Sequence, residues 1–416
     1  MNVVIVGAGP AGITVAELVR RGAPTASITV LSTEPFPPYS PPALADHFLT
    51  GREEPLFWKG RDVAARLALD FRPSTTVVSL DPAGHRVTLG DGSALPFDQL
   101  VIASGSRLHA PIPGWALPGV LDFKSLTAAE AIVRRVRSGE VRRALIVGAG
   151  FIGMEIALLL ADLGVHATII GRRPWLMPRM LDTESAGIAA RIMQSRGVEL
   201  RLGEEATAFL GDGAVEGVAL AGGEVVTADL YVAATGVQPH MEFLAGSGID
   251  THWGIRVDAT LRTSAPDVWA AGDVVESRDR LTGESYVHAI FPNAVEQARV
   301  VADNLLGRAT RYEGAESMNS LKHLGLPLVA AGAPEGPDEL RTRDGDNLRR
   351  VFLSEGRIVG FRLVGDIRGA GVLHQLMLRR EDVRRFHRRL ASPAFGAGTV
   401  VLMAPSPGPV GWVTAA

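Results

Sequence analysis

The chain has 416 residues, 46% hydrophobic and 21% charged, which is enough for two or three ordinary globular domains. Its formal net charge of −3 gives no reason to expect nucleic acid or an acidic membrane surface as a partner. No apolar run reaches the ~18 residues that a membrane span needs. The apolar N-terminus has no preceding basic region, so we expect no signal peptide and a cytoplasmic location.

Cysteine is absent from the sequence. The chain therefore offers no structural disulfide, no thiolate ligand for an iron–sulfur cluster and no catalytic thiol. The ten histidines follow no spacing typical of metal ligands, so no metal site is expected.

The first predicted element is a buried strand over 3–6, and a glycine-rich turn follows it directly. The turn reads GAGPAG, and a helix is predicted over 13–21. In this G-x-G-x-x-G pattern Gly7 makes the tight turn, Gly9 lets a pyrophosphate approach the backbone, and Gly12 lets the helix pack against the strand. The helix N-terminus then faces the phosphates. The alternative is a glycine-rich turn that binds nothing.

The segment after this turn predicts a second strand over 27–31, and Glu34 just beyond it is the candidate to bind ribose hydroxyls. The proline-rich stretch over 33–49 is predicted to be a rigid, non-helical connection, and its length favours a functional loop. Alternation over 77–89, with an Asp91-Gly92 turn, predicts a short antiparallel insertion.

The remaining elements follow from hydrophobic periodicity, and prolines and glycines over 111–119 mark a domain boundary. Strands are predicted at 97–106, 144–147, 167–170, 230–236, 268–273, 328–331, 350–353 and 358–364. Helices are predicted at 126–137, 154–163, 294–306 and 373–390, before a tail rich in proline and glycine.

A second G-x-G-x-x-G pattern, GAGFIG over 148–153, lies between a predicted strand and a predicted helix. Two such fingerprints imply two dinucleotide sites on two sheets. The strand over 268–273 ends on Asp273, an acid at the sheet edge where α/β proteins bind ligands. The predicted fold class is therefore α/β, with two Rossmann-like dinucleotide-binding domains.

The order of these pieces resembles the FAD/NAD(P)-dependent pyridine nucleotide-disulfide oxidoreductases, the two-dinucleotide-binding-domain flavoproteins. The resemblance covers nearly the whole chain and rests on GAGPAG, FDQLVIASGS, GAGFIGME, ATG and TSAPDVWAAGD. The segments PYSPPALADHFLTG and FPNAVEQARVVADNLLG are similar to the branch with rubredoxin reductases, ferredoxin reductases and the flavin part of nitrite reductase.

The resemblance implies an FAD-binding domain at 1–115 and 240–315, an NAD(P)-binding domain at 116–239, and an α+β interface domain at 316–416. It also implies that Asp273 contacts FAD, that Glu155 lies near the nicotinamide, and that the flavin itself carries out hydride transfer. The residues expected to bind the two cofactors are Gly7, Gly9, Pro10, Ala11, Gly12, Glu34, Pro41, Val77, Ser104, Gly105, Gly148, Gly150, Phe151, Ile152, Gly153, Glu155, Arg172, Arg173, Thr235, Gly236, Gly272, Asp273, Pro292 and Asn293.

The chain departs from this family at several positions. No thiol stands near the expected flavin, where the matching position falls close to Ala43, so disulfide reduction is excluded. Ferredoxin reductases usually carry an arginine and a lysine in the proline-rich loop, and Pro41 and Asp46 occupy those places here. Ser104 replaces the usual threonine but keeps the hydroxyl group.

The nicotinamide cofactor is expected to be NAD(P)H, with NADPH favoured. The strand over 167–170 is followed by Gly171, Arg172 and Arg173, without the acid that usually binds the ribose hydroxyls of NADH. A guanidinium group can bind a 2′-phosphate through charge-assisted hydrogen bonds. The alternative is that both arginines face water and do nothing.

The C-terminal helix predicted over 373–390 would carry Arg380, Arg384 and Arg388 on one side. That side could dock an acidic electron carrier, although a solvated face with a Glu381–Arg385 pair is favoured.

The expected function is an FAD-dependent NAD(P)H oxidoreductase that passes electrons to a separate iron–sulfur or similar redox protein. One alternative is a subunit of a larger dehydrogenase complex that delivers substrate electrons to NAD(P)+. Another is a redox-sensing or scaffold flavoprotein with little turnover. The electron acceptor and the oligomeric state, homodimer or complex subunit, cannot be read from the sequence.

Overall fold

The computed structural model describes residues 1–321, 325 and 327–402, so the proline- and glycine-rich tail beyond 402 lies outside the described residues. The chain divides into two compact units. The first unit comprises Met1–Pro178 and Ala189–Ser317, and the second comprises Arg179–Ile188 and Met318–Ala416. Residues 179–188, which the predicted boundaries assign to the NAD(P)-binding domain, thus group with the C-terminal part of the chain. The division of the first unit into FAD- and NAD(P)-binding domains stays a prediction.

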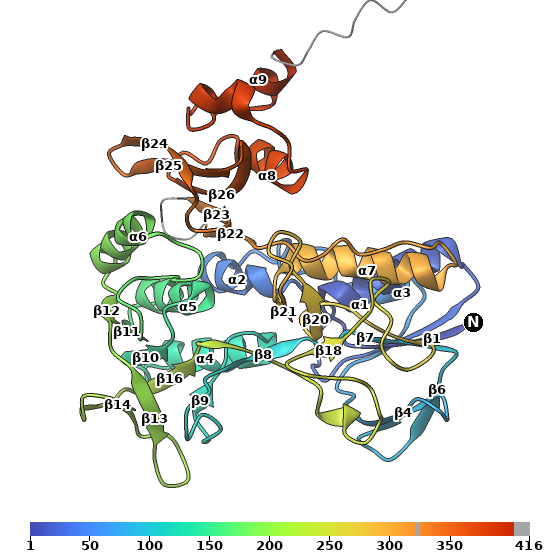
Figure 1. The fold of residues 1–416 in the computed structure, drawn as a ribbon. Helices are drawn as coiled ribbons and strands as arrows, with labels where there is room; N and C mark the ends of the chain where they lie inside the picture. Colours follow the sequence, from blue (N-terminus) through green and yellow to red (C-terminus); the bar gives the residue numbers. More distant parts are fainter. Residues whose placement is uncertain (322–324, 326, 403–416) are drawn as a thin grey trace, which may run out of the picture. The chain divides into compact units, whose positions relative to one another are not determined.

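The first unit contains a five-stranded parallel sheet in the order β19-β7-β1-β2-β3. Its strands are β1 (Asn2–Val6), β2 (Ser27–Leu31), β3 (Asp70–Arg72), β7 (Gln99–Ile102) and β19 (Val268–Ala270). Most residues of β1, β2 and β7 are buried, as expected for strands covered on both faces. The helices α1 (Pro10–Gly22) and α7 (Phe291–Leu305) pack along each other (Figure 1).

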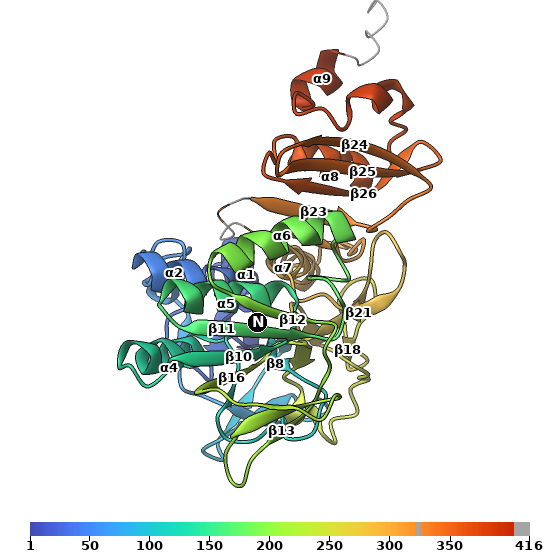
Figure 2. The same cartoon turned by 90° about the vertical axis from the view of Figure 1, so that its left-hand side faces the viewer.

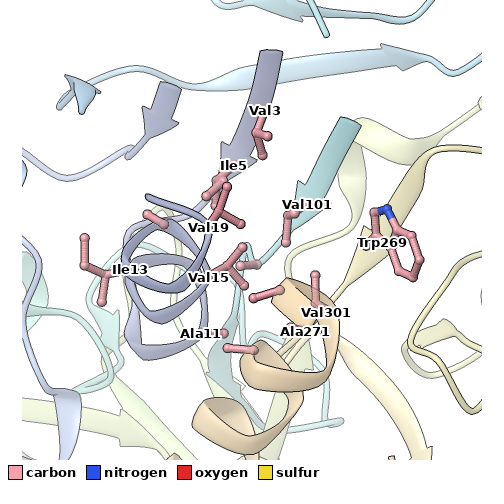
Figure 3. Packing of buried hydrophobic residues seen from close by; sticks show 14 of the residues in the cluster. Val3, Ile5, Ala11, Ile13, Val15, Val19, Val101, Trp269, Ala271 and Val301 are labelled. Atoms are coloured by element: carbon pink, nitrogen blue, oxygen red, sulfur yellow. The ribbon is translucent and has the colours of Figure 1, made fainter. Parts of the chain in front are cut away.

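One apolar cluster joins this sheet to α1 and α7, as Figure 3 shows. Val3 and Ile5 of β1 and Val101 of β7 contribute one side, while Val15 of α1 and Val301 of α7 contribute the other. All five side chains are fully buried. Burial of a side chain of this size is worth about 1.5–3 kcal/mol, so this packing fixes the start of α1 against the end of β1.

The first unit also contains a second five-stranded parallel sheet, in the order β12-β11-β10-β16-β9. Its strands are β9 (Val120–Leu121), β10 (Arg143–Val147), β11 (His166–Gly171), β12 (Glu199–Leu202) and β16 (Leu230–Ala233). The helix α5 (Phe151–Asp162) packs on β10 and β11. The helix α4 (Leu126–Arg137) is capped by the Ser125 hydroxyl, which accepts a hydrogen bond from the Ala128 N–H at 3.2 Å. The repeat of strand, glycine turn and helix predicted from the sequence is present.

The strands β8 (Ser106–His109) and β17 (Gly236–Pro239) form a two-stranded antiparallel ribbon. Along the chain, β8 comes directly after β7 of the first sheet, and β17 comes directly after β16 of the second sheet. The residues predicted as one strand over 97–106 thus divide between β7 and the start of β8. The smaller sheets are β4 (Val77–Asp81) with β5 (Arg86–Leu89) and β6 (Ala94–Pro96), β13 (Ala206–Leu210) with β14 (Gly217–Leu220) and β15 (Val225–Val226), and β18 (Ile255–Arg256) with β20 (Val275–Arg278) and β21 (Ser285–Val287). The short helices are α3 (Val63–Arg66) and η2 (Glu242–Leu244).

The second unit is built on an antiparallel sheet in the order β22-β23-β26-β25-β24 (Figure 2). Its strands are β22 (Met318–Leu321), β23 (Leu328–Gly332), β24 (Asp338–Asp344), β25 (Asn347–Ser354) and β26 (Arg357–Val364). The helix α8 (Ala370–Leu378) packs on β26, and η3 (Arg384–Arg389) and α9 (Ala397–Leu402) follow it. The helix α6 (Thr183–Ser195) has its first residues in this unit.

The prediction of a non-helical segment over 33–49 is wrong in its last part. The 3-10 turn η1 (Pro41–Ala43) leads into the helix α2 (Leu44–Thr50), which ends at Gly51 with a φ of 73°. Proline is well tolerated in the first turn of a helix because its missing N–H would be unpaired there. The prolines that suggested an extended loop therefore start a helix instead.

The prediction of one helix over 373–390 is also wrong. The helix α8 stops at Leu378, and Arg380 has a left-handed backbone with a φ of 51°. The N–H of Arg380 donates to the carbonyl of Met377 at 3.0 Å, and the N–H of Glu381 donates to that of Leu376 at 3.1 Å, which is a Schellman motif. Arg380, Arg384 and Arg388 thus do not share one helical face. Glu381 pairs with Arg379 at 3.8 Å, and the predicted Glu381–Arg385 pair is not among the ion pairs of the described residues.

Candidate functional site

The first glycine turn forms a cradle between β1 and α1. Gly7 has a φ of 112°, and a Cβ there would lie 2.1 Å from the Ala103 carbonyl oxygen. A Cβ on Gly12 would lie 1.9 Å from the Gly7 carbonyl oxygen, so both positions require glycine. Gly9 has open space beside it and stands directly before Pro10, the first residue of α1, with Ala11 buried behind it.

The second glycine turn repeats this geometry between β10 and α5. Gly148 has a φ of 131°, and a Cβ there would lie 2.2 Å from the Ala234 carbonyl oxygen. A Cβ on Gly153 would lie 2.1 Å from the Gly148 carbonyl oxygen, while Gly150 has open space beside it. The half-buried residues Phe151 and Ile152 form the first turn of α5, whose free N–H groups point out of the helix end.

These two cradles fit the phosphates of two dinucleotides. At each turn the outer glycines are required by the close backbone approach within the chain, whereas the middle glycine, Gly9 or Gly150, borders open space. A helix N-terminus beside that open glycine provides N–H donors and partial positive charge for a pyrophosphate. The residues present therefore fit one dinucleotide at each turn, and the assignment of FAD to Gly7–Gly12 and of the nicotinamide dinucleotide to 148–153 stays a prediction.

Asp273 lies three residues beyond β19, after Gly272, whose φ is 84°. Its carboxylate accepts a hydrogen bond from the Lys124 ammonium group, and both side chains are mostly buried, at 20% and 13% exposed. Lys124 also donates to the Ser106 hydroxyl. Lys124 was not among the predicted site residues. Its rarity could have drawn attention to it, because lysine occurs only at 59, 124 and 322 in a chain that otherwise uses arginine.

Glu34, the predicted ribose ligand, has both carboxylate oxygens engaged within the chain. Its Oε1 atom accepts from the N–H and the hydroxyl of Thr127, at 2.9 and 2.7 Å, and Oε2 accepts from the Tyr39 hydroxyl. Tyr39 in turn accepts from the N–H of Leu126 at 2.9 Å. Burial, together with the Glu34 charge, raises the pKa of Tyr39 far above its usual range. Glu34 therefore holds the start of α4, and its role toward a ribose stays a prediction.

Ser104 and Gly105 connect the first sheet to the chain that follows β17. The Ser104 hydroxyl donates to the His240 carbonyl at 2.7 Å, and the Gly105 carbonyl accepts from the His240 N–H at 3.0 Å. Arg107, next along β8, pairs with Glu242 at 2.7 Å. These bonds join the segment that follows β7 to the segment that follows β17, and they involve two residues predicted to contact FAD, Ser104 and Gly105.

The remaining predicted FAD contacts lie in different settings. Pro41 begins η1, and Val77 is buried at the start of β4. Pro292 lies in the first turn of α7. The Asn293 side chain is buried and bonds both backbone groups of Glu316, at 2.9 and 3.0 Å, so it has a structural role.

His288, three residues before α7, was not predicted. The residue is 5% exposed, and its Nε2 atom has no hydrogen-bond partner within the part of the chain that the structure describes. Burial lowers the pKa of His288 to about 4, so the imidazole is neutral at pH 7. A buried ring nitrogen without a partner can bond a cofactor atom, and it fits a polar ligand at this helix start.

Glu155 lies one turn into α5, on the helix that follows the second cradle. The helix α2 packs against α5, and Asp46 is the third residue of α2. Burial, with a smaller contribution from the Asp46 charge, raises the pKa of Glu155 to about 8. A carboxyl group therefore faces a second acid at the contact of these helices.

The predicted ligands of the nicotinamide dinucleotide beyond the cradle are more exposed. Arg172 and Arg173 follow β11, and Arg172 is 70% exposed, 3.6 Å from Glu205. The Thr235 hydroxyl donates to the His109 carbonyl at 2.9 Å, and Gly236 begins β17. The site roles of all these residues stay predictions.

Comparison with known proteins identifies the class to which this site belongs. The family model for pyridine nucleotide-disulphide oxidoreductases matches residues 1–298. The chain is 29% identical to the epsilon subunit of an NADH-dependent phenylglyoxylate dehydrogenase of Aromatoleum evansii, over 96% of both chains. It is 30% identical to a probable ferredoxin reductase of Castellaniella defragrans, over 92% of this chain and 95% of the relative.

Solved structures support the same fold. A covalent complex of putidaredoxin reductase with putidaredoxin matches with a TM-score of 0.85 at 24% identity, covering 98% of this chain and 99% of that one. The protein belongs to the pyridine nucleotide-disulphide oxidoreductase family and is an FAD-dependent NAD(P)H oxidoreductase. Within the described residues, no helix is both long enough and apolar enough to cross a membrane.

Proposed function

We propose that the protein takes electrons from NAD(P)H and delivers them to a separate iron–sulfur protein. The observation that carries this proposal is the presence of two dinucleotide cradles in one compact unit of a chain that has no cysteine. Without a thiol the chain cannot pass electrons to a disulfide, so an external acceptor must take them. Relatives named as ferredoxin, rubredoxin and terpredoxin reductases support a small iron–sulfur acceptor.

The chain's own residues supply binding and orientation. Bound FAD would supply the hydride chemistry, as flavins do in this class. Gly9 and Gly150 leave the backbone open to phosphate groups, and the first turns of α1 and α5 provide N–H donors. Lys124 and Asp273 form a mostly buried ion pair that orients the polar edge of the FAD site.

Anaerobic reduction tests this function. The purified protein should be yellow, and addition of NADPH or NADH should bleach the flavin absorbance within one turnover. A reduced sample should then transfer electrons to a purified small ferredoxin or rubredoxin. Colourless protein that cannot be reconstituted with FAD would overturn the proposal, and so would flavin that is reduced but passes nothing to either iron–sulfur protein.

NADPH is the proposed preferred cofactor. Arg172 and Arg173 both follow β11, no acid ends that strand, and the only carboxylate paired with Arg172 in the described residues is the exposed Glu205. A charge-assisted bond is worth roughly 1.5–3 kcal/mol, which corresponds to a preference of about tenfold to a hundredfold. The kcat/KM ratio for NADPH over NADH should fall by that factor in Arg172→Ala/Arg173→Ala. A ratio below one in the parent protein, unchanged in this variant, would contradict the preference.

A second candidate is favoured by one relative. The epsilon subunit of phenylglyoxylate dehydrogenase matches along almost the whole chain, and its name describes part of a larger assembly. In that case the protein would pass substrate electrons to NAD(P)+. Purification from the native host discriminates the two: a stable co-purifying set of subunits supports the complex, and a single active chain supports the reductase.

A further inference from the structure

Two loops at one edge of the second sheet lie next to the second glycine turn. The strands β10, β11 and β12 are parallel neighbours, so their carboxyl ends share this edge (Figure 2). The glycine turn over 148–153 follows β10, Arg172 follows β11, and Gly203 follows β12. Because α/β sheets bind their ligands at the carboxyl ends of the strands, a dinucleotide held at the glycine turn would have both loops beside it.

Short contacts fix these loops against the glycine turn. A Cβ on Gly171 would lie 2.7 Å from the Cβ of Ala149, so β11 ends directly against the turn. The N–H of Gly203 donates to the carbonyl of Gly171 at 2.7 Å and to that of Arg173 at 3.1 Å. The backbone around Arg172 is therefore held between the glycine turn and the end of β12.

The acids near the end of β12 differ in their partners. Arg201 binds Glu204 at 2.6 Å and Glu224 at 2.5 Å, so its charge is used twice. The Glu205 carboxylate accepts no hydrogen bond from any described residue, and its ion pair there is with Arg172. Glu205 is therefore the acid at this edge whose oxygens are open to a ligand.

The other charged groups of these strands lie away from this edge. His166 begins β11 and Glu199 begins β12, so both lie at the amino ends of the strands, where they pair with each other at 3.9 Å. Arg143 begins β10 at the same far edge. They are separated from Arg172 and Glu205 by the length of the strands.

The pair of Arg172 and Glu205 is weak enough to give way to a ligand. The two side chains are 70% and 51% exposed, and 3.6 Å separates Nη1 from Oε1, which is longer than a good charged hydrogen bond. Exposed pairs of this kind contribute little free energy, because water solvates both charges. A guanidinium group and a carboxylate are thus both available at this edge.

We propose that Arg172 and Glu205 together bind the adenosine ribose of the nicotinamide dinucleotide, and that Glu205 allows NAD(H) to bind as well as NADP(H). The inference rests on the proposed function, because it takes this dinucleotide to occupy the turn over 148–153. With NADP(H), Arg172 leaves Glu205 and binds the 2′-phosphate. With NAD(H), the Glu205 carboxylate accepts hydrogen bonds from the ribose hydroxyls, and so replaces the acid that is absent from the end of β11. Glu205 thus reduces the preference for NADPH that Arg172 and Arg173 provide.

Binding calorimetry of the FAD-loaded protein tests the inference in the variant Glu205→Ala. The probes are NADP+, NAD+ and the fragments adenosine 2′,5′-bisphosphate and 5′-AMP, which lack the nicotinamide. The affinity for NADP+ should rise about twofold to fivefold, because Arg172 no longer has to leave an ion pair. The affinity for NAD+ should fall about fivefold, because the ribose hydroxyls lose their acceptor. The two fragments should show the same two shifts, since the contacts involve only the ribose and its 2′-phosphate.

Two further variants assign the effect to the pair. Glu224→Ala is the matched control, because it removes an equal charge that Arg201 already binds, and both affinities should change by less than about twofold. In the background of Arg172→Ala, Glu205→Ala should produce a smaller gain for NADP+, because no guanidinium group remains to be released. The loss for NAD+ should persist in that background.

The inference would be overturned by an affinity ratio of NADP+ to NAD+ that is the same in Glu205→Ala and in the parent protein, or by an equal change of this ratio in Glu224→Ala. Shifts seen with the dinucleotides but with neither fragment would also overturn it, because Glu205 would then act away from the ribose. Failure of both NADP+ and NAD+ to bind the FAD-loaded protein would overturn the proposed function together with this inference. Binding of both, with a ratio that Glu205→Ala leaves unchanged, would overturn the inference alone.

Discussion

Gly148 and Gly150 lie two residues apart in one turn but lack a side chain for different reasons. Gly148 needs a left-handed backbone and has the Ala234 carbonyl where a Cβ would stand, so Gly148→Ala should lower the free energy of unfolding by about 1–3 kcal/mol or more. Gly150 has nothing within 4 Å of a Cβ position, so Gly150→Ala should change stability by less than about 0.5 kcal/mol. Its added methyl group should nevertheless weaken NADP+ binding by at least about tenfold.

Denaturant unfolding and equilibrium binding of NADP+ measure the two effects separately. A Gly150→Ala protein that binds NADP+ as tightly as the parent would show that no phosphate approaches this turn.

His288 gives the molecule a pH-dependent stability. Its pKa of about 4 in the folded protein lies below the ordinary value of 6.5, because burial disfavours the charged ring. The unfolded chain therefore binds the proton more readily, so the stabilisation is complete above about pH 6.5 and is lost as the pH falls toward about 4. Between pH 7 and pH 5 the loss should be on the order of 2 kcal/mol.

The variant His288→Gln should remove that part of the pH dependence, as measured by denaturant unfolding at the two pH values. His166→Gln, which changes an exposed histidine, serves as the control and should leave the difference intact. An equal loss in His288→Gln and in the parent protein would assign the pH dependence to other groups.

At the scale of elements, the end of α8 depends on one residue in an unusual conformation. Arg380 has a φ of 51°, which costs energy for a residue with a Cβ, whereas Arg379 just before it has a φ of −77°. Arg380→Gly should therefore raise the melting temperature and stabilise the protein by about 0.5–1 kcal/mol. Arg379→Gly removes the same charge at a helical position and should lower stability, so a matching response of both variants would contradict the backbone explanation.

The elements that the sequence predicted well are those whose signal is local. The strand–glycine–helix units at Gly7 and Gly148 were predicted because short-range sterics dictate them. The end of α8 was missed because Val383 and Phe386 are buried after it, and this burial is decided by distant contacts such as the Val383 N–H bond to the Gly356 carbonyl at 2.8 Å. The Lys124–Asp273 pair was missed for the same reason, since 149 positions separate the two residues.

At the scale of the whole molecule, the grouping of residues 179–188 with the C-terminal part of the chain has a visible cause. Glu184 bonds Arg341 at 2.6 Å and Arg343 at 2.8 Å, both on β24. Asp182 bonds Arg350 on β25. The segment MLDTESAGI carries no pattern that predicts these partners. An ion pair between residues more than 150 positions apart produces no periodicity that a sequence could show. The predicted boundary at residue 316 therefore could not include this segment.

Asp182 makes two kinds of interaction in the second unit, a helix cap and an ion pair. We expect their loss to lower the stability of the second unit and not that of the first. Its carboxylate caps α6 by accepting from the N–H groups of Glu184 and Ser185, each at 3.0 Å, and it pairs with Arg350, which is 16% exposed. In Asp182→Asn the cap can persist through the amide oxygen, whereas Arg350 keeps only Glu339 as its acidic partner among the described residues. We expect a loss of about 1–2 kcal/mol, given the partial exposure of the pair.

Native-state hydrogen exchange locates this loss. Amide protection should fall in β24 and β25 and stay unchanged in β1 and β2, because unfolding of the second unit need not expose the sheet of the first. Glu355→Gln, which changes an 84% exposed acid of the same unit, should leave all four strands unaffected. If protection fell equally in both sheets, the two units would unfold as one cooperative body, and the charges around Asp182 would stabilise the whole chain.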